Sequence, residues 1–100
     1  MSKPRLTYFP VRGRAELARL IMVQAGVEWD EVAVNPESLG QLKQSGVLAF
    51  DQVPLYEEGD FALVQSNTIA RYLARKNGLY GSNEHEGAKI DEIVEDLPML

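Results

Sequence analysis

The fold is decided at residues 61–75, which read FALVQSNTIARYLAR. Residues 61–64 form an apolar run typical of a strand, and residues 67–75 carry apolar side chains at helical spacing. Gln65 and Ser66 stand at the junction. A serine at a helix N-terminus can offer its hydroxyl group and nearby unpaired backbone N–H groups to a carboxylate, and the helix dipole favours negative charge there. The junction therefore predicts a binding site for a small acidic ligand.

A β-hairpin is expected just before this junction. Residues 53–56 and 61–64 read as two antiparallel strands, joined by a turn at residues 57–60 in which Gly59 can supply a positive φ. The acidic side chains of this turn are interpreted as a solvated surface without a chemical role. They are Glu57, Glu58 and Asp60.

The N-terminal half predicts a βαβ unit. Residues 6–9 read as a short buried strand, and residues 14–25 as a helix that ends where Gly26 supplies a C-terminal cap. Residues 28–34 read as a second strand. Residues 35–51 show no clean period, so we expect a short irregular helix within loops there.

The complete order of elements is that of a thioredoxin-like α/β domain. A helix over residues 66–77 completes the series β-α-β-α-β-β-α, which describes one mixed four-stranded sheet with helices packed over it. We place this domain at residues 1–81.

A last helix carries an apolar stripe and stops at Pro98. The stripe comprises Ile90, Ile93, Val94 and Leu97. Either a second subunit or further sequence must cover it, and we favour the second interpretation. Residues 82–100 are then a linker and the first helix of a truncated all-α second domain.

Composition limits the classes of function. The chain has 100 residues, of which 45% are hydrophobic and 25% charged, as in an ordinary globular domain. Its apolar stretches are too short to cross a bilayer, and residues 1–5 lack the apolar region of a secretory signal, so a cytoplasmic location is expected. The absence of cysteine excludes thiol chemistry by the chain's own side chains. A net charge of −5 disfavours nucleic acid as a partner.

Tyr8 stands where redox members of this fold carry their reactive cysteine pair, between the first strand and the first long helix. A tyrosine there can donate its O–H to a bound thiolate, which stabilises the anion and lowers the pKa of the ligand's thiol. The alternative is a strand aromatic that packs in the core. In either case the sulfur must belong to the ligand.

Three motifs carry a resemblance to a known family. Residues 6–14 (LTYFPVRGR), 52–54 (QVP) and 65–69 (QSNTI) closely resemble cytosolic glutathione transferases, and the pi class is the nearest likeness. The resemblance covers essentially the whole chain. It implies a cytoplasmic, homodimeric detoxification enzyme that binds glutathione as co-substrate, needs no metal, and activates the glutathione thiolate for conjugation to electrophilic apolar substrates.

The resemblance also assigns the residues that bind glutathione. They are Tyr8, Arg14, Lys43, Gln52, Val53, Pro54, Gln65, Ser66 and Asp96. Tyr8 is the implied catalytic residue, because the family tyrosine hydrogen-bonds the glutathione sulfur. Gln65 and Ser66 are implied to hold the γ-glutamyl carboxylate. Val53 is implied to pair its backbone with the peptide, beside a cis Pro54.

The remaining assignments concern charged groups and the glycyl end of glutathione. Lys43 and Gln52 are implied to meet that end. Arg14 resembles the family arginine beside the tyrosine, where a permanent cation favours both the peptide carboxylates and the thiolate. Asp96 resembles the acidic residue that reaches across a dimer to the other subunit's glutathione amino group.

The sequence departs from the pi-class pattern at one place. Pi-class chains carry a tryptophan after the second strand that helps to hold the glycyl carboxylate, and residues 35–42 contain none. Trp29 matches a structural position and is interpreted as packing. His85, the single histidine, is interpreted as a surface residue because no second imidazole or thiolate accompanies it.

Ordinary interpretations and other functions stay open beside these assignments. Taken singly, Ser66 suits an ordinary helix cap, Arg14 and Lys43 solvated charges, and Gln52 a turn. The chain also suits a non-catalytic glutathione-transferase-like module for dimerisation or scaffolding, or a glutathione-dependent peroxidase or isomerase. Because the family places most of the electrophile pocket on its second domain, we expect this chain alone to bind glutathione weakly and to turn over poorly or not at all.

Overall fold

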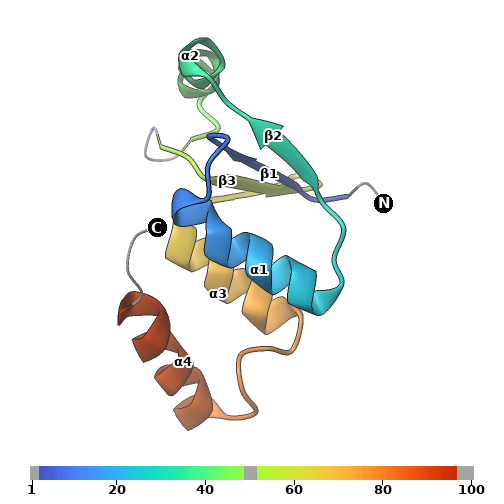
Figure 1. Ribbon diagram of the computed structural model, residues 1–100, viewed down its shortest axis with the longest axis vertical. Helices are drawn as coiled ribbons and strands as arrows, with labels where there is room; N and C mark the ends of the chain where they lie inside the picture. The colour runs from blue at the N-terminus through green and yellow to red at the C-terminus, as the bar shows by residue number, and fades with distance from the viewer. Residues whose placement is uncertain (1–2, 49–51, 97–100) are drawn as a thin grey trace.

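The computed structural model describes residues 3–48 and 52–96, with the side chains of residues 3–48 and 52–92. The elements follow one another in the expected order (Figure 1). They are β1 (Arg5–Tyr8), the 3-10 turn η1 (Gly13–Ala15), α1 (Glu16–Ala25), β2 (Asp30–Ala33), α2 (Pro36–Ser45), β3 (Leu55–Glu58), β4 (Phe61–Val64), α3 (Ser66–Lys76) and α4 (Glu84–Asp96).

The strands form one mixed sheet in the order β2-β1-β3-β4. β1 runs parallel to β2 and antiparallel to β3, and β3 runs antiparallel to β4. Leu6 on β1 lies opposite Glu31 on β2 and Tyr56 on β3. The predicted four-stranded thioredoxin-like arrangement is therefore confirmed.

The core lies where α1 and α3 pack side by side against the sheet (Figure 1). Its side chains come from β1, η1, α1, β3 and α3, and complete burial of each large one contributes about 1.5–3 kcal/mol. They are Leu6, Tyr8, Ala15, Ala18, Met22, Tyr56, Ile69 and Leu73. Tyr8 belongs to this cluster, which fixes its ring at the C-terminal end of β1.

The first helical segment begins as a 3-10 turn and becomes an α-helix only at Glu16, two residues later than the expected start at Arg14. Its end is the predicted one. Gly26 adopts a left-handed φ of 72°, and its N–H donates to the carbonyls of Met22 and Val23. A residue with a side chain would be strained in this conformation, so the glycine ends the helix here.

α2 corrects the expectation of a short irregular helix, because residues 36–45 form a regular helix. Asn35 and Ser38 form a reciprocal capping box, with both side chain to backbone distances at 2.9 Å. Pro36 occupies the first turn and Gly46, with φ 81°, ends the helix. No residue of α2 is buried. Local capping chemistry therefore defines this helix. Because the helix buries no side chain, its sequence shows no apolar periodicity from which a regular helix could be predicted.

The hairpin is present but shifted along the sequence. β3 extends to Glu58, which pairs with Phe61, so the turn is the two residues Gly59 and Asp60 and not residues 57–60. Gly59 has the expected positive φ, at 59°. Val53 and Pro54 lie ahead of β3 and not within it.

α4 packs beside α3, and an ion pair of 2.7 Å joins Arg71 Nε to Asp91 Oδ1 (Figure 1). Of the predicted apolar stripe, Ile90 is half-buried. The side chains of Ile93, Val94 and Leu97 lie outside the described residues, as does the expected stop at Pro98. The division of the chain near residue 81 stays a prediction.

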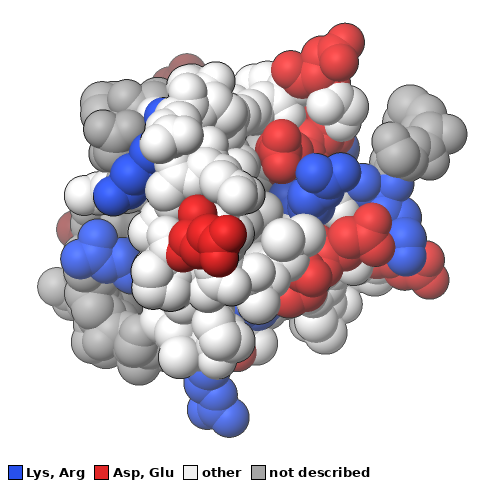
Figure 2. All heavy atoms as spheres, turned by 90° about the horizontal axis from the view of Figure 1, so that it is seen from above, with Lys and Arg blue, Asp and Glu red and all other residues white. Residues whose placement is uncertain are grey.

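Figure 2 shows basic and acidic groups intermingled on the right, an acidic group within the uncharged surface near the centre, and separate basic groups on the left, and not one continuous basic patch. Among the helices in the described ranges, none has the length and apolar character needed to span a bilayer.

Candidate functional site

A small cleft opens at the N-terminus of α3. It is lined by Arg14, Gln52, Val53, Pro54, Gln65 and Ser66. These residues come from three separate parts of the chain: the 3-10 turn, the segment before β3, and the junction between β4 and α3. All of them belong to the predicted site, and the fold brings them together.

The junction itself has an unusual backbone. Gln65 has φ 77° and ψ 115°, and it is the one non-glycine residue with a positive φ in the described part of the chain. Such a conformation costs about 1–3 kcal/mol and persists only where the surrounding structure holds it. It turns the chain out of β4, so that Gln65 takes the N-cap position and Ser66 is the first residue of α3.

Ser66 is therefore not the helix cap that its ordinary interpretation suggests. The first backbone hydrogen bond of α3 runs from Ile69 N–H to the Gln65 carbonyl, at 2.9 Å. The preceding amides, of residues 66–68, have no carbonyl partner within the helix. Since the Gln65 side chain makes no capping bond, these amides and the Ser66 hydroxyl remain able to bind an anion.

The Val53–Pro54 peptide bond is cis, as the resemblance implies. Pro54 is buried, Val53 is half-buried against the core, and Gln52 is exposed. All three residues line the cleft.

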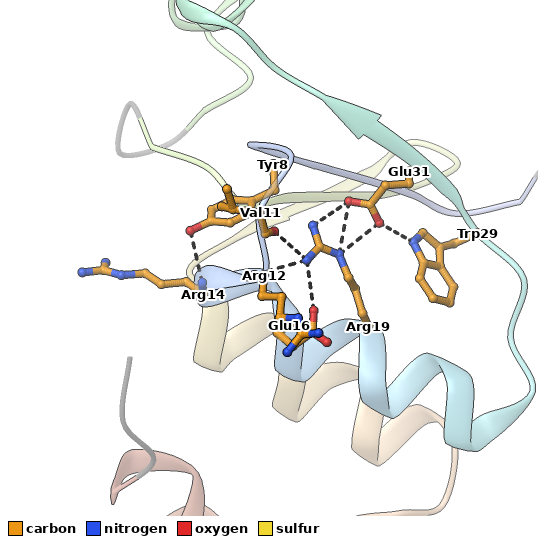
Figure 3. A network of polar contacts seen from close by, with 8 residues as sticks. All are labelled: Tyr8, Val11, Arg12, Arg14, Glu16, Arg19, Trp29 and Glu31. Atoms are coloured by element: carbon orange, nitrogen blue, oxygen red, sulfur yellow. Dashed lines mark hydrogen bonds and ion pairs between the residues drawn. The ribbon is translucent and has the colours of Figure 1, made fainter. Parts of the chain in front are cut away.

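Tyr8 combines the two interpretations that the sequence left open. Its ring is in the core and the residue is only 8% exposed. Its hydroxyl oxygen, however, accepts a hydrogen bond of 3.1 Å from the backbone N–H of Arg14, which lines the cleft (Figure 3). A phenol can accept and donate at once, so its own hydrogen is still available to a ligand.

Gly13 makes this close approach possible. A Cβ at this position would lie 2.5 Å from Tyr8 Oη, and Gly13 has φ 45°. Both the space and the dihedral angle therefore require glycine. The Arg14 guanidinium points away from Tyr8 (Figure 3), so in this structure the backbone of Arg14, and not its charge, contacts the hydroxyl.

Three predicted residues are absent from the cleft lining. Tyr8 is the first, and the hydrogen bond from the Arg14 amide connects its hydroxyl to a residue that lines the cleft. Lys43 is exposed on α2 and is absent from the cleft lining. Asp96 ends α4, but its side chain lies outside the described residues. His85 is exposed on α4, and within residues 3–48 and 52–96 no group of three His, Cys, Asp or Glu side chains could hold a metal ion.

Sequence reasoning missed Arg19, which lies on α1 beside Tyr8 (Figure 3). Its guanidinium binds both carboxylate oxygens of Glu31, with Nη2 to Oε2 at 2.7 Å. The Trp29 indole N–H donates to the same carboxylate at 2.9 Å, which adds a polar contact to the predicted packing role of Trp29. The pairing crosses from α1 to β2, and no local pattern in the sequence indicates it.

Arg19 and Glu31 each stabilise the charged form of the other. Burial tends to raise the pKa of Glu31, but hydrogen bonds from Arg19 and Trp29 outweigh it and lower that pKa. The hydrogen bond to Glu31 is the main cause that raises the pKa of Arg19. Both groups are therefore held in their charged forms at neutral pH.

A second network corrects the interpretation of Glu58 as a solvated turn residue. The hydroxyls of Tyr56 and Tyr72 each donate to Glu58 at 2.8 Å, and Lys76 forms an ion pair with it. The hydrogen bond from Lys76 is the main cause that lowers the pKa of Glu58. None of these residues lines the cleft.

Comparison with known proteins gives a consistent result. A family model described as Glutathione S-transferase, N-terminal domain, matches residues 4–75. The chain is 45% identical over 97 residues to Glutathione S-transferase P 1 of Xenopus laevis and 52% identical over 95 residues to Glutathione S-transferase P 2 of Bufo bufo. It is also 45% identical over 96 residues to Glutathione S-transferase alpha-1 of Rattus norvegicus.

These alignments cover 92%, 91% and 95% of this chain but 46%, 43% and 43% of the relatives. The chain therefore spans less than half the length of the relatives it matches. Among solved structures, a Nu-class GST from Haemonchus contortus superposes with a TM-score of 0.85 at 39% identity, over 95% of this chain and 46% of that one. A glutathione S-transferase from Ascaris lumbricoides gives 0.84 at 41% identity, over 92% and 44%.

Proposed function

We propose that this chain, which belongs to the glutathione S-transferase family, binds glutathione in the cleft at α3 and supplies the groups that activate its thiolate for conjugation to electrophilic apolar substrates. One observation carries the proposal. The cleft gathers six predicted glutathione residues, and the amide of one of them, Arg14, contacts the Tyr8 hydroxyl.

The N-terminus of α3 would hold the γ-glutamyl carboxylate. The Ser66 hydroxyl and the amides that follow Gln65 are donors without a helical carbonyl partner, and the helix dipole favours an anion there. The backbone of Val53, ahead of β3, would pair with the peptide. Gln52 and Lys43 would meet the glycyl end.

Tyr8 would bind the sulfur. The Arg14 N–H occupies one acceptor site of the hydroxyl oxygen, and this leaves the hydroxyl hydrogen to donate to a thiolate. A hydrogen bond to the charged form lowers the pKa of the thiol, which is about 8.5 in a free cysteine side chain. The thiol proton goes to solvent, and the thiolate is the form that reacts.

The bond-forming step needs no covalent intermediate with the protein. The thiolate's electron pair forms a C–S bond to the electrophilic carbon, and the electron pair of the broken bond goes to the leaving group. The chain contributes position and electrostatic stabilisation.

Further parts of the proposal concern the whole protein. We expect a cytoplasmic homodimer in which Asp96 reaches the partner subunit's glutathione amino group. Residues 1–81 would form the glutathione-binding domain, and residues 82–100 would begin an all-α domain that carries most of the electrophile pocket.

Glutathione affinity, measured by titration calorimetry, tests the carboxylate site. Ser66→Ala should weaken binding about tenfold or more, the effect of one hydrogen bond to a charged group. Ser45→Ala, a serine on α2 whose hydroxyl bonds to the Leu42 carbonyl outside the cleft, is the matched control and should bind normally. Equal affinity in both variants would contradict the assignment of Ser66.

Tyr8→Phe tests the sulfur site. Glutathione should still bind, and conjugation of an aromatic halide should fall about a hundredfold, as for loss of one preorganised donor to an anion. Tyr72→Phe removes a hydroxyl outside the cleft and should keep the activity. A folded wild-type protein that binds no glutathione would instead favour the scaffold alternative, and thiol-dependent peroxide or isomerase turnover without conjugation would favour the third function.

A further inference from the structure

Arg19 is the centre of a network that spans the loop between β1 and η1 (Figure 3). Besides Glu31, its guanidinium binds two consecutive backbone carbonyls of that loop. Nη1 donates to the Val11 carbonyl at 2.9 Å and to the Arg12 carbonyl at 3.1 Å. It also donates to Glu16 Oε1 at 3.2 Å. The Arg19 side chain is only 17% exposed, although the Val11 residue beside it is 57% exposed.

The loop needs such an anchor because it lies on the surface. Phe9 and Val11 are both exposed, and a short-range backbone bond within the loop runs from Val11 N–H to the Phe9 carbonyl, at 2.7 Å. The Arg12 carbonyl that Arg19 holds is two residues from the Arg14 amide. That amide donates to Tyr8 Oη. A displacement of the loop therefore moves the group that holds the hydroxyl.

The shape of arginine suits this task. Nε and Nη2 face Glu31 while Nη1 faces the loop, so the planar group joins β2 to the loop in one rigid piece. Glu31 is in turn fixed by the Trp29 indole. A lysine would keep the positive charge but could not reproduce a fork with donors in two directions.

We propose that Arg19 is a positioning residue for the thiolate chemistry: by binding the Val11 and Arg12 carbonyls, it places the Arg14 amide on Tyr8 Oη and so directs the hydroxyl hydrogen into the cleft. The inference deepens the proposed function and rests on it for the sulfur. The geometric part, from Arg19 to the Arg14 amide, concerns the free protein alone.

A different route from Arg19 to Tyr8 has to be separated from this one. The Arg19 Cζ atom lies 5.9 Å from the centre of the Tyr8 ring, so its charge could act on the phenol directly. Arg19→Lys separates the two routes, because it keeps a cation and loses the fork. Glu58→Gln is the matched control, since it removes a carboxylate from a comparable network outside the cleft.

Two measurements are made on each variant. The first is hydrogen exchange of the Arg14 backbone amide by NMR in the absence of ligand, with the Leu73 amide in α3 as the internal reference. In Arg19→Lys the Arg14 amide should exchange about tenfold faster relative to Leu73, as for the loss of one hydrogen bond. The second is the pH profile of the ultraviolet thiolate absorbance of bound glutathione. In Arg19→Lys the thiolate fraction at neutral pH should fall about threefold to tenfold.

Glu58→Gln should change neither value, although it lowers the stability of the protein. If Arg19→Lys does not fold, Trp29→Phe provides the milder variant, because it removes one of the bonds that fix Glu31. The same two changes, smaller in size, are expected there.

Each result decides a separate point. Unchanged Arg14 exchange in Arg19→Lys overturns the positioning role. Faster exchange with an unchanged thiolate profile shows that the sulfur does not depend on this amide, and overturns the catalytic part. A profile that changes equally in Glu58→Gln would also overturn it. If the wild-type protein binds no glutathione, the proposed function fails, while Arg14 exchange still decides whether Arg19 positions the loop.

Discussion

Glu31 and Glu58 centre two networks of similar composition and different effect. Each carboxylate accepts hydrogen bonds from an aromatic side chain and a cation, and each has a lowered pKa. Arg19 extends the first network to two backbone carbonyls beside Tyr8. Lys76 and the two tyrosines bind Glu58 through side chains only, and join the hairpin to α3.

The comparison teaches that the donor geometry of the cation, more than its charge, decides what a partly exposed ion pair can control. A planar guanidinium has donors left over after it binds a carboxylate, and it can fix a loop backbone with them. An ammonium group attracts its partner as a point charge and adds little direction. The first network therefore affects the site, and the second affects mainly stability.

The largest difference between the two regions should come from their glycines. Gly13→Ala should destabilise the protein by about 3 kcal/mol, because the residue has a positive φ and the new Cβ would meet Tyr8 Oη. Gly59→Ala in the hairpin should cost only about 1–2 kcal/mol, since its φ is also positive but nothing lies within 4 Å of the new Cβ. Urea unfolding of the two variants measures both values, and equal losses would show that the contact between Gly13 and Tyr8 has no energetic weight.

Removal of the two cations, Arg19 and Lys76, should give a smaller difference in the free energy of unfolding, again with the larger loss in the region of the Glu31 network. Arg19→Met should cost about 1–2 kcal/mol, because the Glu31 carboxylate and two loop carbonyls lose their donor, although water can reach the 41% exposed Glu31 side chain. Lys76→Met should cost about 0.5–1 kcal/mol, since the Lys76 side chain is 47% exposed and solvent screens its ion pair. The same unfolding measurement applies, and a larger loss in Lys76→Met would reverse the ranking proposed here.

The smallest expected difference between the two networks is in how the free energy of unfolding depends on pH, and it is of order 1 kcal/mol. Both glutamate pKa values are lowered from 4.5, so both networks stabilise the fold above that value and lose this contribution as the pH falls through the folded-state pKa. The two tyrosines make the stability that the Glu58 network contributes depend on pH in the alkaline range as well, which the Glu31 network does not. The pKa of Tyr56 is raised by burial and by Glu58, and that of Tyr72 is raised mainly by its bond to Glu58.

A raised tyrosine pKa gives stability that is complete below the ordinary value of 10.0 and is lost as the pH rises through the folded-state pKa. Trp29, the aromatic donor in the Glu31 network, does not titrate. Tyr72→Phe should therefore flatten the alkaline side of the stability profile, and Trp29→Phe should leave its shape unchanged. Unfolding midpoints between about pH 7 and pH 11 test this, and a steeper alkaline loss in Tyr72→Phe would contradict the assignment.

Particular residues show how far the sequence could lead. The Gly26 and Gly59 dihedral angles and the order of strands and helices follow from local turn and period signals. The cis Pro54 followed from the family motif. α2 was underestimated because its capping box involves only Asn35 and Ser38 and no apolar face. Glu58 was misinterpreted because its partners Tyr72 and Lys76 lie on a helix beyond the next strand.

The sequence by itself determined the thioredoxin-like order of elements and the residue types at the cleft, because capping, turn chemistry and apolar spacing act between residues close together in the chain. Only the tertiary structure decided which atom of Arg14 faces the Tyr8 hydroxyl, and that Arg19 joins β2 to the loop ahead of it. These contacts depend on how α1 packs against the sheet and on the register of β1 with β2. Directional hydrogen bonds form only once packing has fixed both partners, so no pattern in the sequence specifies them alone.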